Sequence, residues 1–143
     1  MANEVMQLNI AILVKQVPET RSVRMDESTG TVIRQSNEAI INPLDLYAIQ
    51  AALQLKKQFP AARLTAFSMG PAAAERVLKE ALALGVDDAV LISDRAYAGS
   101  DTWATARILA AALRRAGKFD LIFTGERATD GDTGQVGPEL AAA

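Results

Sequence analysis

The chain contains 143 residues, of which 50% are hydrophobic and 22% charged, a length and composition typical of a single globular domain. It has no cysteine and no histidine, which excludes disulfides, iron–sulfur ligation, metal sites built on thiolate or imidazole, and catalytic triads with a histidine base. The formal net charge is −2 and no run of Lys or Arg exceeds two residues, so neither nucleic acid nor an anionic membrane surface is favoured as a partner.

The N-terminal segment carries no sign of targeting to a membrane. The first eight residues contain neither a positively charged stretch nor an apolar one, and nowhere in the chain do about eighteen apolar residues follow one another. We therefore expect a soluble, cytoplasmic protein without membrane insertion.

The first half of the chain predicts a strand, a hairpin and a helix. Residues 9–14 are apolar without polar alternation, which is typical of a parallel strand covered on both faces, and residues 15–18 end it. Residues 21–25 and 31–34 flank a turn-rich stretch, residues 26–30, and predict a small exposed hairpin. Asn42 followed by Pro43 predicts an N-cap and the first position of a helix over residues 43–58, with an inner face formed by Leu46, Ile49 and Leu53.

The second half alternates strands and helices. Strands are expected at residues 63–69, 89–92 and 119–124. Between the first two lies a helix whose stripe is Val77, Leu78, Ala81 and Leu82 and whose C-terminal stop is Gly85. Ser100 or Asp101 caps a helix over residues 102–116 that Gly117 closes. This alternation predicts an α/β fold: an open, doubly wound, mostly parallel sheet with helices on both faces.

The last predicted helix begins near Thr133 and continues to residue 143 without a capping glycine or a basic last turn. We therefore expect residues 1–143 to form one α/β domain that is truncated at its C-terminal end. A short docked helix is the alternative interpretation.

Residues 125–135 are the most informative candidate for a ligand site. Ligands of open α/β sheets bind beyond the carboxyl ends of the strands, and this segment places glycines, hydroxyls and acids between a strand and a helix start. Such a loop favours a phosphate. The glycines at 131, 134 and 137 match neither a dinucleotide fingerprint nor a P-loop. Two further interpretations are a capped turn, with Asp132 as N-cap and Gly131 left-handed, and a magnesium site at Asp130 and Asp132.

Five segments in register give the sequence a specific resemblance. They are residues 14–18 (VKQVP), 41–45 (INPLD), 68–71 (SMGP), 81–87 (ALALGVD) and 124–139 (TGERATDGDTGQVGPE). In their order and spacing they resemble the β subunit of electron transfer flavoproteins. Gly131, Gly134 and the stretch of residues 93–105 resemble more specifically its bifurcating or nitrogen-fixation-linked branch. The resemblance covers the chain from about Leu8 to its end, and it implies a fold of the adenine nucleotide alpha hydrolase-like type.

The resemblance implies an electron carrier rather than an enzyme with a substrate of its own. Such a subunit pairs with an electron transfer flavoprotein α subunit, which holds the electron-carrying flavin, and transfers electrons from acyl-CoA or other dehydrogenases to an acceptor. The β subunit holds an adenine nucleotide. By this resemblance Leu13 and Lys15 would flank the adenosine, Asn42 and Asp45 would lie near the adenine and ribose, and Met69 would contact the ring. The residues that would surround the phosphate are Gly125, Asp130, Gly131, Asp132, Thr133, Gly134 and Gln135.

The nucleotide itself is expected to be FAD, with AMP as the alternative. The AMP-binding branch has bulkier residues in the loop that here contains Gly131 and Gly134, so the glycines leave room for a pyrophosphate and a flavin. Thr133 and Gln135 would bond the phosphates. Two other classes were weighed: a stand-alone adenine-nucleotide-binding regulator of the universal-stress type, whose glycine pattern is missing after residue 124, and a small hydrolase using Asp130 and Asp132, which lacks an activated base.

Overall fold

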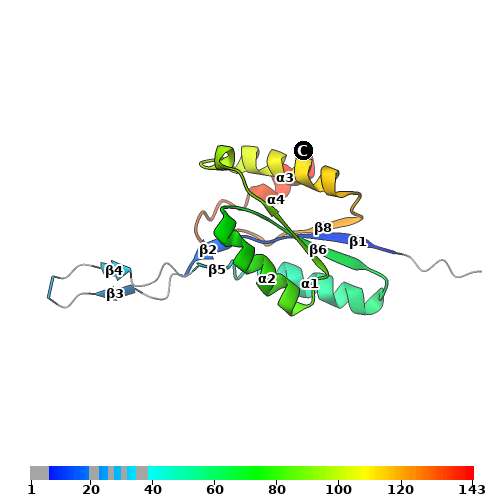
Figure 1. The fold of residues 1–143 in the computed structure, drawn as a ribbon, viewed down its shortest axis with the longest axis horizontal. Helices are drawn as coiled ribbons and strands as arrows, with labels where there is room; N and C mark the ends of the chain where they lie inside the picture. The colour runs from blue at the N-terminus through cyan, green and yellow to red at the C-terminus, as the bar shows by residue number, and fades with distance from the viewer. Residues whose placement is uncertain (1–6, 20–22, 26–27, 30–31, 35–38) are drawn as a thin grey trace, which may run out of the picture.

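Four parallel strands form the main sheet of the computed structural model, which describes residues 7–19, 23–25, 28–29, 32–34 and 39–143. The strands are β1 (Asn9–Leu13), β6 (Arg63–Met69), β7 (Asp88–Ile92) and β8 (Leu121–Phe123), in the spatial order β7-β6-β1-β8 (Figure 1). The chain builds the sheet from β1 outward through β6 and β7 and then returns to the other side of β1 with β8. This reversal is the topological switch point of a doubly wound sheet, so the predicted fold class is confirmed.

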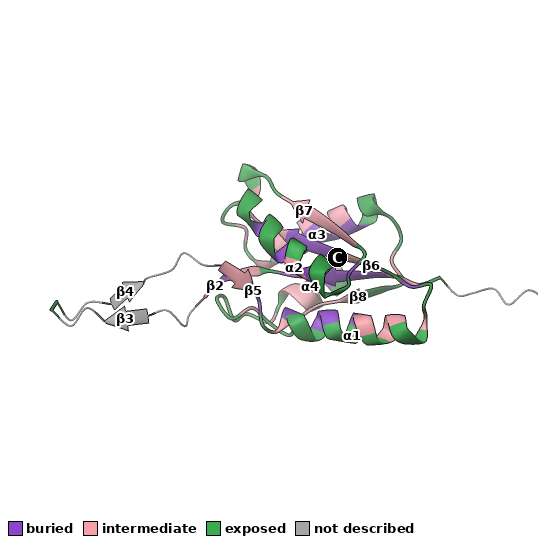
Figure 2. Cartoon of the chain, turned by 60° about the horizontal axis from the view of Figure 1, so that its bottom comes forward, coloured by how far each residue is buried: buried purple, intermediate pink, exposed green. Residues whose placement is uncertain are grey.

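Helices cover both faces of the sheet because alternate strand residues carry two separate apolar surfaces. The helices α1 (Asp45–Gln58) and α2 (Glu75–Leu84) lie on one face, and α3 (Thr102–Ala116) and α4 (Val136–Ala142) lie on the other (Figure 1). Ile10 and Ile12 of β1 belong to the cluster under α1 and α2, whereas Ala11 and Leu13 belong to the cluster under α3 and α4. The buried residues accordingly follow the central strands and the inner sides of the helices (Figure 2).

The predicted ends of α2 and α3 are confirmed by their caps. Gly85 follows α2 with a φ of 117°, a left-handed conformation that glycine adopts without steric penalty. Asp101 caps α3, and its carboxylate accepts the backbone amide of Ala104 at 2.8 Å. Two predicted inner residues were wrong, since Leu46 of α1 and Leu82 of α2 are each 40% exposed. The residues that α1 and α2 bury are instead Asp45, Ala48, Ile49 and Ala52, and Val77, Leu78 and Ala81.

Two short ribbons accompany the main sheet. Strands β3 (Val23–Met25) and β4 (Val32–Arg34) pair antiparallel and confirm the predicted hairpin, although residues 26, 27 and 30 of its turn lie outside the described residues. Strands β2 (Gln16–Pro18) and β5 (Ala39–Ile41) form a second antiparallel pair at the carboxyl edge of the main sheet (Figure 1). This pair was not predicted, because three-residue strands carry too little periodicity to be recognised.

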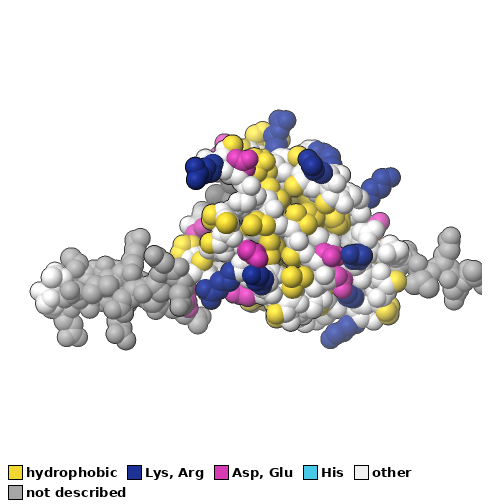
Figure 3. Space-filling model, in the orientation of Figure 1, with side chains coloured by type: hydrophobic (Ala, Val, Ile, Leu, Met, Phe, Trp, Pro, Cys, Tyr) yellow, Lys and Arg dark blue, Asp and Glu magenta, His cyan; other side chains and the backbone are white. Residues whose placement is uncertain are grey.

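The surface has an open sheet edge and mixed charges. Strand β8 ends the sheet on one side, and its Leu121 and Ile122 are 41% and 45% exposed. On the face drawn in Figure 3, Lys and Arg side chains are dispersed among Asp and Glu around a hydrophobic middle. Within the described ranges, none of the helices combines the length and the apolar character needed to cross a bilayer.

Candidate nucleotide site

The predicted site residues converge where β1 and β8 end side by side. Lys15 follows β1, Gly125 follows β8, and Asn42 and Asp45 stand at the entry to α1. The backbone amide of Asn42 donates to the carbonyl of Lys15 at 2.8 Å, which fixes the segment before α1 against the end of β1. The switch point of the sheet therefore gathers segments that are more than 80 positions apart in the sequence.

Asp45 is a buried carboxylate at the centre of this convergence. The residue is only 6% exposed, and its Oδ2 accepts the backbone amide of Lys15 at 2.7 Å. Its other polar neighbours are the side chain of Asn42 and the backbone amide of Gly125. Burial outweighs these hydrogen bonds and the attraction of the Lys15 charge, and it raises the pKa of Asp45 from 3.8 to about 6.

The raised pKa makes a prediction about stability. Folding favours the protonated form of Asp45. The contribution of this protonation to the free energy of unfolding is fully present below pH 3.8 and is lost as the pH rises through about 6. The shift corresponds to about 3 kcal/mol. In Asp45→Asn the free energy of unfolding should therefore rise by about this amount relative to the wild type between pH 4 and pH 7, as urea denaturation would measure.

Asp87→Asn provides the control for the sign of this effect. Partial burial raises the pKa of Asp87, but the Lys56 ion pair and the hydrogen bond from the Leu64 amide outweigh it and lower that pKa. A carboxylate with a lowered pKa stabilises the fold at high pH, and this stabilisation is lost as the pH falls. Relative to the wild type, Asp87→Asn should therefore lose stability as the pH rises. A parallel pH dependence in the two variants would contradict the assignment.

Asn42 holds the loop after β8 rather than capping α1. Its side chain is 1% exposed, its Nδ2 donates to the carbonyl of Arg127 at 2.9 Å, and its Oδ1 accepts the amide of Thr129 at 3.2 Å. The predicted N-cap was wrong: α1 begins at Asp45 and has no side-chain cap. The amide group instead satisfies two backbone groups of a distant loop, a role that sequence spacing does not reveal.

Two exposed ion pairs involve the same loop, one joining it to Lys15 and one within it. Lys15 Nζ lies 2.8 Å from Asp130 Oδ1, and Arg127 lies 3.0 Å from Asp132. Although partial burial raises the pKa of Asp130, the hydrogen bonds from Lys15 and from the Gly131 amide outweigh it and hold that pKa below its usual value. These exposed pairs contribute little to stability, but they place two cations and two carboxylates at the rim of the site.

The predicted turn chemistry of the loop was partly wrong. Asp132 is not an N-cap, because α4 begins at Val136 and is preceded by Gln135. The left-handed residues are Asp132, with φ 56°, and Gly134, with φ 62°, whereas Gly131 has no positive φ. An aspartate takes this conformation more readily than most residues do. The left-handed backbone expected at Gly131 is therefore found at the next residue, Asp132.

The remaining predicted residues lie around the site at different depths. Leu13, 8% exposed, and the partly buried Met69 belong to the apolar cluster beneath α3 and α4. Thr133 and Gln135 are exposed, and the Gln135 side chain donates to the Thr133 carbonyl at 3.3 Å. Leu13, Lys15, Asn42, Asp45, Gly125 and Asp130 are therefore brought together around the ends of β1 and β8, while residues 131–135 form the outer part of the loop.

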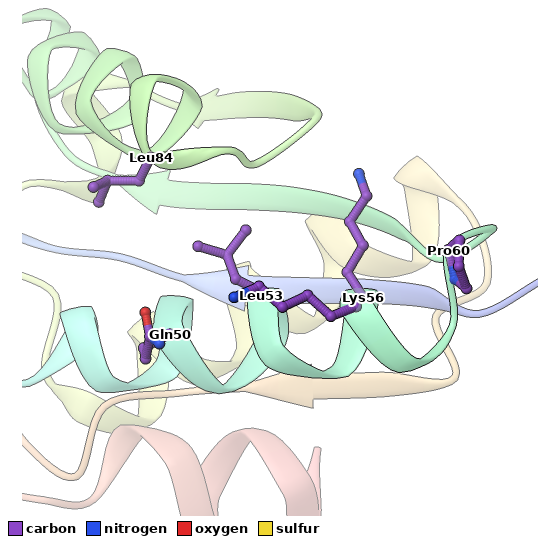
Figure 4. Close-up of a pocket in the computed structure, with 6 residues that line it drawn as sticks. Gln50, Leu53, Lys56, Pro60 and Leu84 are labelled. Atoms are coloured by element: carbon purple, nitrogen blue, oxygen red, sulfur yellow. The ribbon is translucent and has the colours of Figure 1, made fainter.

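A separate hollow lies between α1 and α2 and contains none of the predicted site residues. It measures about 480 Å³ and is lined by Gln50, Leu53, Lys56, Lys57, Pro60 and Leu84 (Figure 4). Leu53 and Leu84 extend into it from the two helices, and Lys56 is engaged with Asp87. Because its lining residues are exposed or only half-buried, it is an open seam between helices rather than a built binding site.

Comparison with known proteins identifies the family of the chain. The electron transfer flavoprotein domain matches residues 29–143. The electron transfer flavoprotein subunit beta of Clostridium acetobutylicum is 49% identical over 134 residues, which cover 94% of this chain and 51% of the relative. Subunit CarD of the caffeyl-CoA reductase-Etf complex of Acetobacterium woodii is 46% identical with the same coverage, and protein FixA of Azotobacter vinelandii is 46% identical over 94% of this chain and 48% of the relative.

The chain thus spans about half the length of the curated relatives it matches. The Clostridium acetobutylicum relative is named as an electron transfer subunit, which agrees with the expectation of an electron carrier. The recognised motifs, the switch-point site and the family match lead to one conclusion: the chain belongs to the electron transfer flavoprotein family.

Proposed function

We propose that this chain forms the nucleotide-binding part of an electron transfer flavoprotein β subunit, which pairs with an α subunit and carries electrons from acyl-CoA or other dehydrogenases to an acceptor. The observation that carries the proposal is the convergence of Lys15, Asn42, Asp45 and Gly125 at the switch point, beside the glycine-containing loop of residues 125–135. Crevices at switch points are where doubly wound sheets bind nucleotides. The electron-transfer names of the relatives support the same role.

The nucleotide we propose is FAD rather than AMP, with its phosphates near Thr133 and Gln135. Space beside the loop supports this choice, because a Cβ added at Gly131 would meet no atom within 4 Å. Lys15 Nζ stands at the rim and can pair with a phosphate in exchange for Asp130. A second flavin would also allow this subunit to take part in flavin-based electron bifurcation.

The proposal predicts which nucleotides the assembled protein releases. The chain is produced with an electron transfer flavoprotein α subunit, purified as a complex and denatured, and the released nucleotides are identified by mass. Two FAD per complex is the expected result. One FAD and one AMP would refute FAD in this subunit but retain nucleotide binding, and a chain that carries neither and binds no α subunit would overturn the proposed function.

A further inference from the structure

The Asp45 carboxylate is surrounded by protein donors from three chain segments. The Lys15 amide approaches from the end of β1 at 2.7 Å, the Gly125 amide from the end of β8, and the Asn42 side chain from the segment before α1. With the residue 6% exposed, its oxygens are engaged by the protein itself. The carboxylate is therefore a junction between segments, and little of it is left to touch a ligand.

Gly125 completes this junction by allowing a very close approach. A Cβ at residue 125 would overlap Asp45 Oδ1 and would lie 3.0 Å from the Leu44 carbonyl carbon and 3.1 Å from the Asp45 amide nitrogen. The loop that begins at Gly125 is thus pressed against the first turn of α1. From there the loop continues to Arg127 and Thr129, whose backbone groups bind Asn42.

We propose that Asp45 is a positioning residue: its ionised carboxylate draws the segments after β1 and β8 to the start of α1 and so sets the shape of the nucleotide site without contacting the nucleotide. This inference rests on the proposed function. It keeps the expectation that Asp45 lies near the adenine and ribose, and it assigns the carboxylate a role through the surrounding chain segments.

The proposal connects nucleotide binding to pH. An ionised carboxylate accepts at both oxygens, whereas protonation places an O–H donor among the amide donors of Lys15 and Gly125. Lys15 is the charged residue whose field acts on Asp45, and Asn42 and Gly125 contribute neutral groups. Since burial brings the pKa of Asp45 to about 6, the site should loosen as the pH falls through this range.

The test measures FAD binding by equilibrium dialysis from about pH 8 to about pH 5.5, using the full chain with and without its α subunit. FAD is the probe because its pyrophosphate stays ionised throughout. Wild-type affinity should fall about fourfold over this range, as expected for one group with a pKa near 6. Asp45→Asn should bind about tenfold or more weakly at pH 8 and show no pH dependence around 6.

Asp87→Asn is the matched control. Its carboxylate also accepts a backbone amide, that of Leu64 at 2.8 Å, and it pairs with Lys56, but it lies at the opposite end of the parallel strands, where β7 begins. This variant should keep the wild-type affinity and pH profile. Unchanged FAD binding in folded Asp45→Asn would overturn the proposal, and so would a flat wild-type profile, which needs no substitution. A wild type that binds neither FAD nor AMP would instead refute the proposed function.

Discussion

Gly125→Ala should strongly impair nucleotide binding. The added methyl group would overlap the Asp45 carboxylate and press on backbone atoms of residues 44 and 45 at 3.0 and 3.1 Å, and backbone cannot move aside as a flexible side chain can. Overpacking of this kind costs about 1–3 kcal/mol. If the loop relieves the overlap by moving away from α1, nucleotide affinity should fall about tenfold for each 1.4 kcal/mol that the native approach costs.

Gly117→Ala is the control for this result. Residue 117 lies between α3 and β8, at the other end of β8 from the site, and a Cβ there would meet no atom within 4 Å. Its φ of 147° strains an alanine, so this variant carries a backbone penalty without touching the site. The nucleotide-to-protein ratio after gel filtration should therefore drop in Gly125→Ala and change little in Gly117→Ala, with circular dichroism reporting the fold of both. Equal retention by the two variants would show that the junction of Gly125 with Asp45 does not shape the site.

Phe67→Ala should cause the largest loss of stability. Phe67 is completely buried in β6, and its ring meets Phe119 edge to face, with centroids 5.5 Å apart. Removing a buried aromatic ring costs about 3–5 kcal/mol through lost burial and the remaining cavity, a large share of the stability of a domain of this size. Urea denaturation measures the effect.

The exposed aromatic residue Tyr47 offers a comparison for Phe67. It is 75% exposed on α1, so Tyr47→Ala should change the free energy of unfolding by less than about 0.5 kcal/mol. A Phe67→Ala variant that loses no more than Tyr47→Ala would mean that the cluster under α3 and α4 does not support the sheet. Nucleotide binding should weaken with Phe67→Ala as well, because the Phe67 ring belongs to the same apolar cluster as Leu13 and Met69, two of the predicted site residues.

Much of the fold could be predicted because parallel strands and amphipathic helices leave local patterns. The apolar run before Val14, the glycine after α2 and the aspartate before α3 each indicate an element through a nearby physical cause. The start of α1 was placed too early because Asn-Pro satisfies the local rules for a helix start, while the Asn42 side chain is engaged by backbone groups 85 and 87 positions away. Rules based on neighbouring residues do not take such distant hydrogen-bond partners into account.

The candidate site was predictable in its location but not in its internal connections. Glycines between a strand and a helix mark a loop suited to a ligand, and motif resemblance named its residues. The sequence could not show that Asp45 is buried, because an acid in the first turn of a helix is ordinarily exposed. Which residue of the loop takes the left-handed conformation also depends on tertiary contacts, and here Asp132 and Gly134 take it instead of Gly131.

The central position of β1 has a consequence for how the protein is made. Asn9, at the start of β1, bonds to Asp120 just before β8, a partner 111 positions later in the chain. At ribosomal synthesis rates this separation corresponds to a delay on the order of ten seconds. Pairing with β6 and cover by α1 can shield one edge and one face of β1 early. Its other edge stays open until β8 has emerged, so β1 gains its second neighbour late, and the growing chain depends on an apolar strand with one open edge not aggregating.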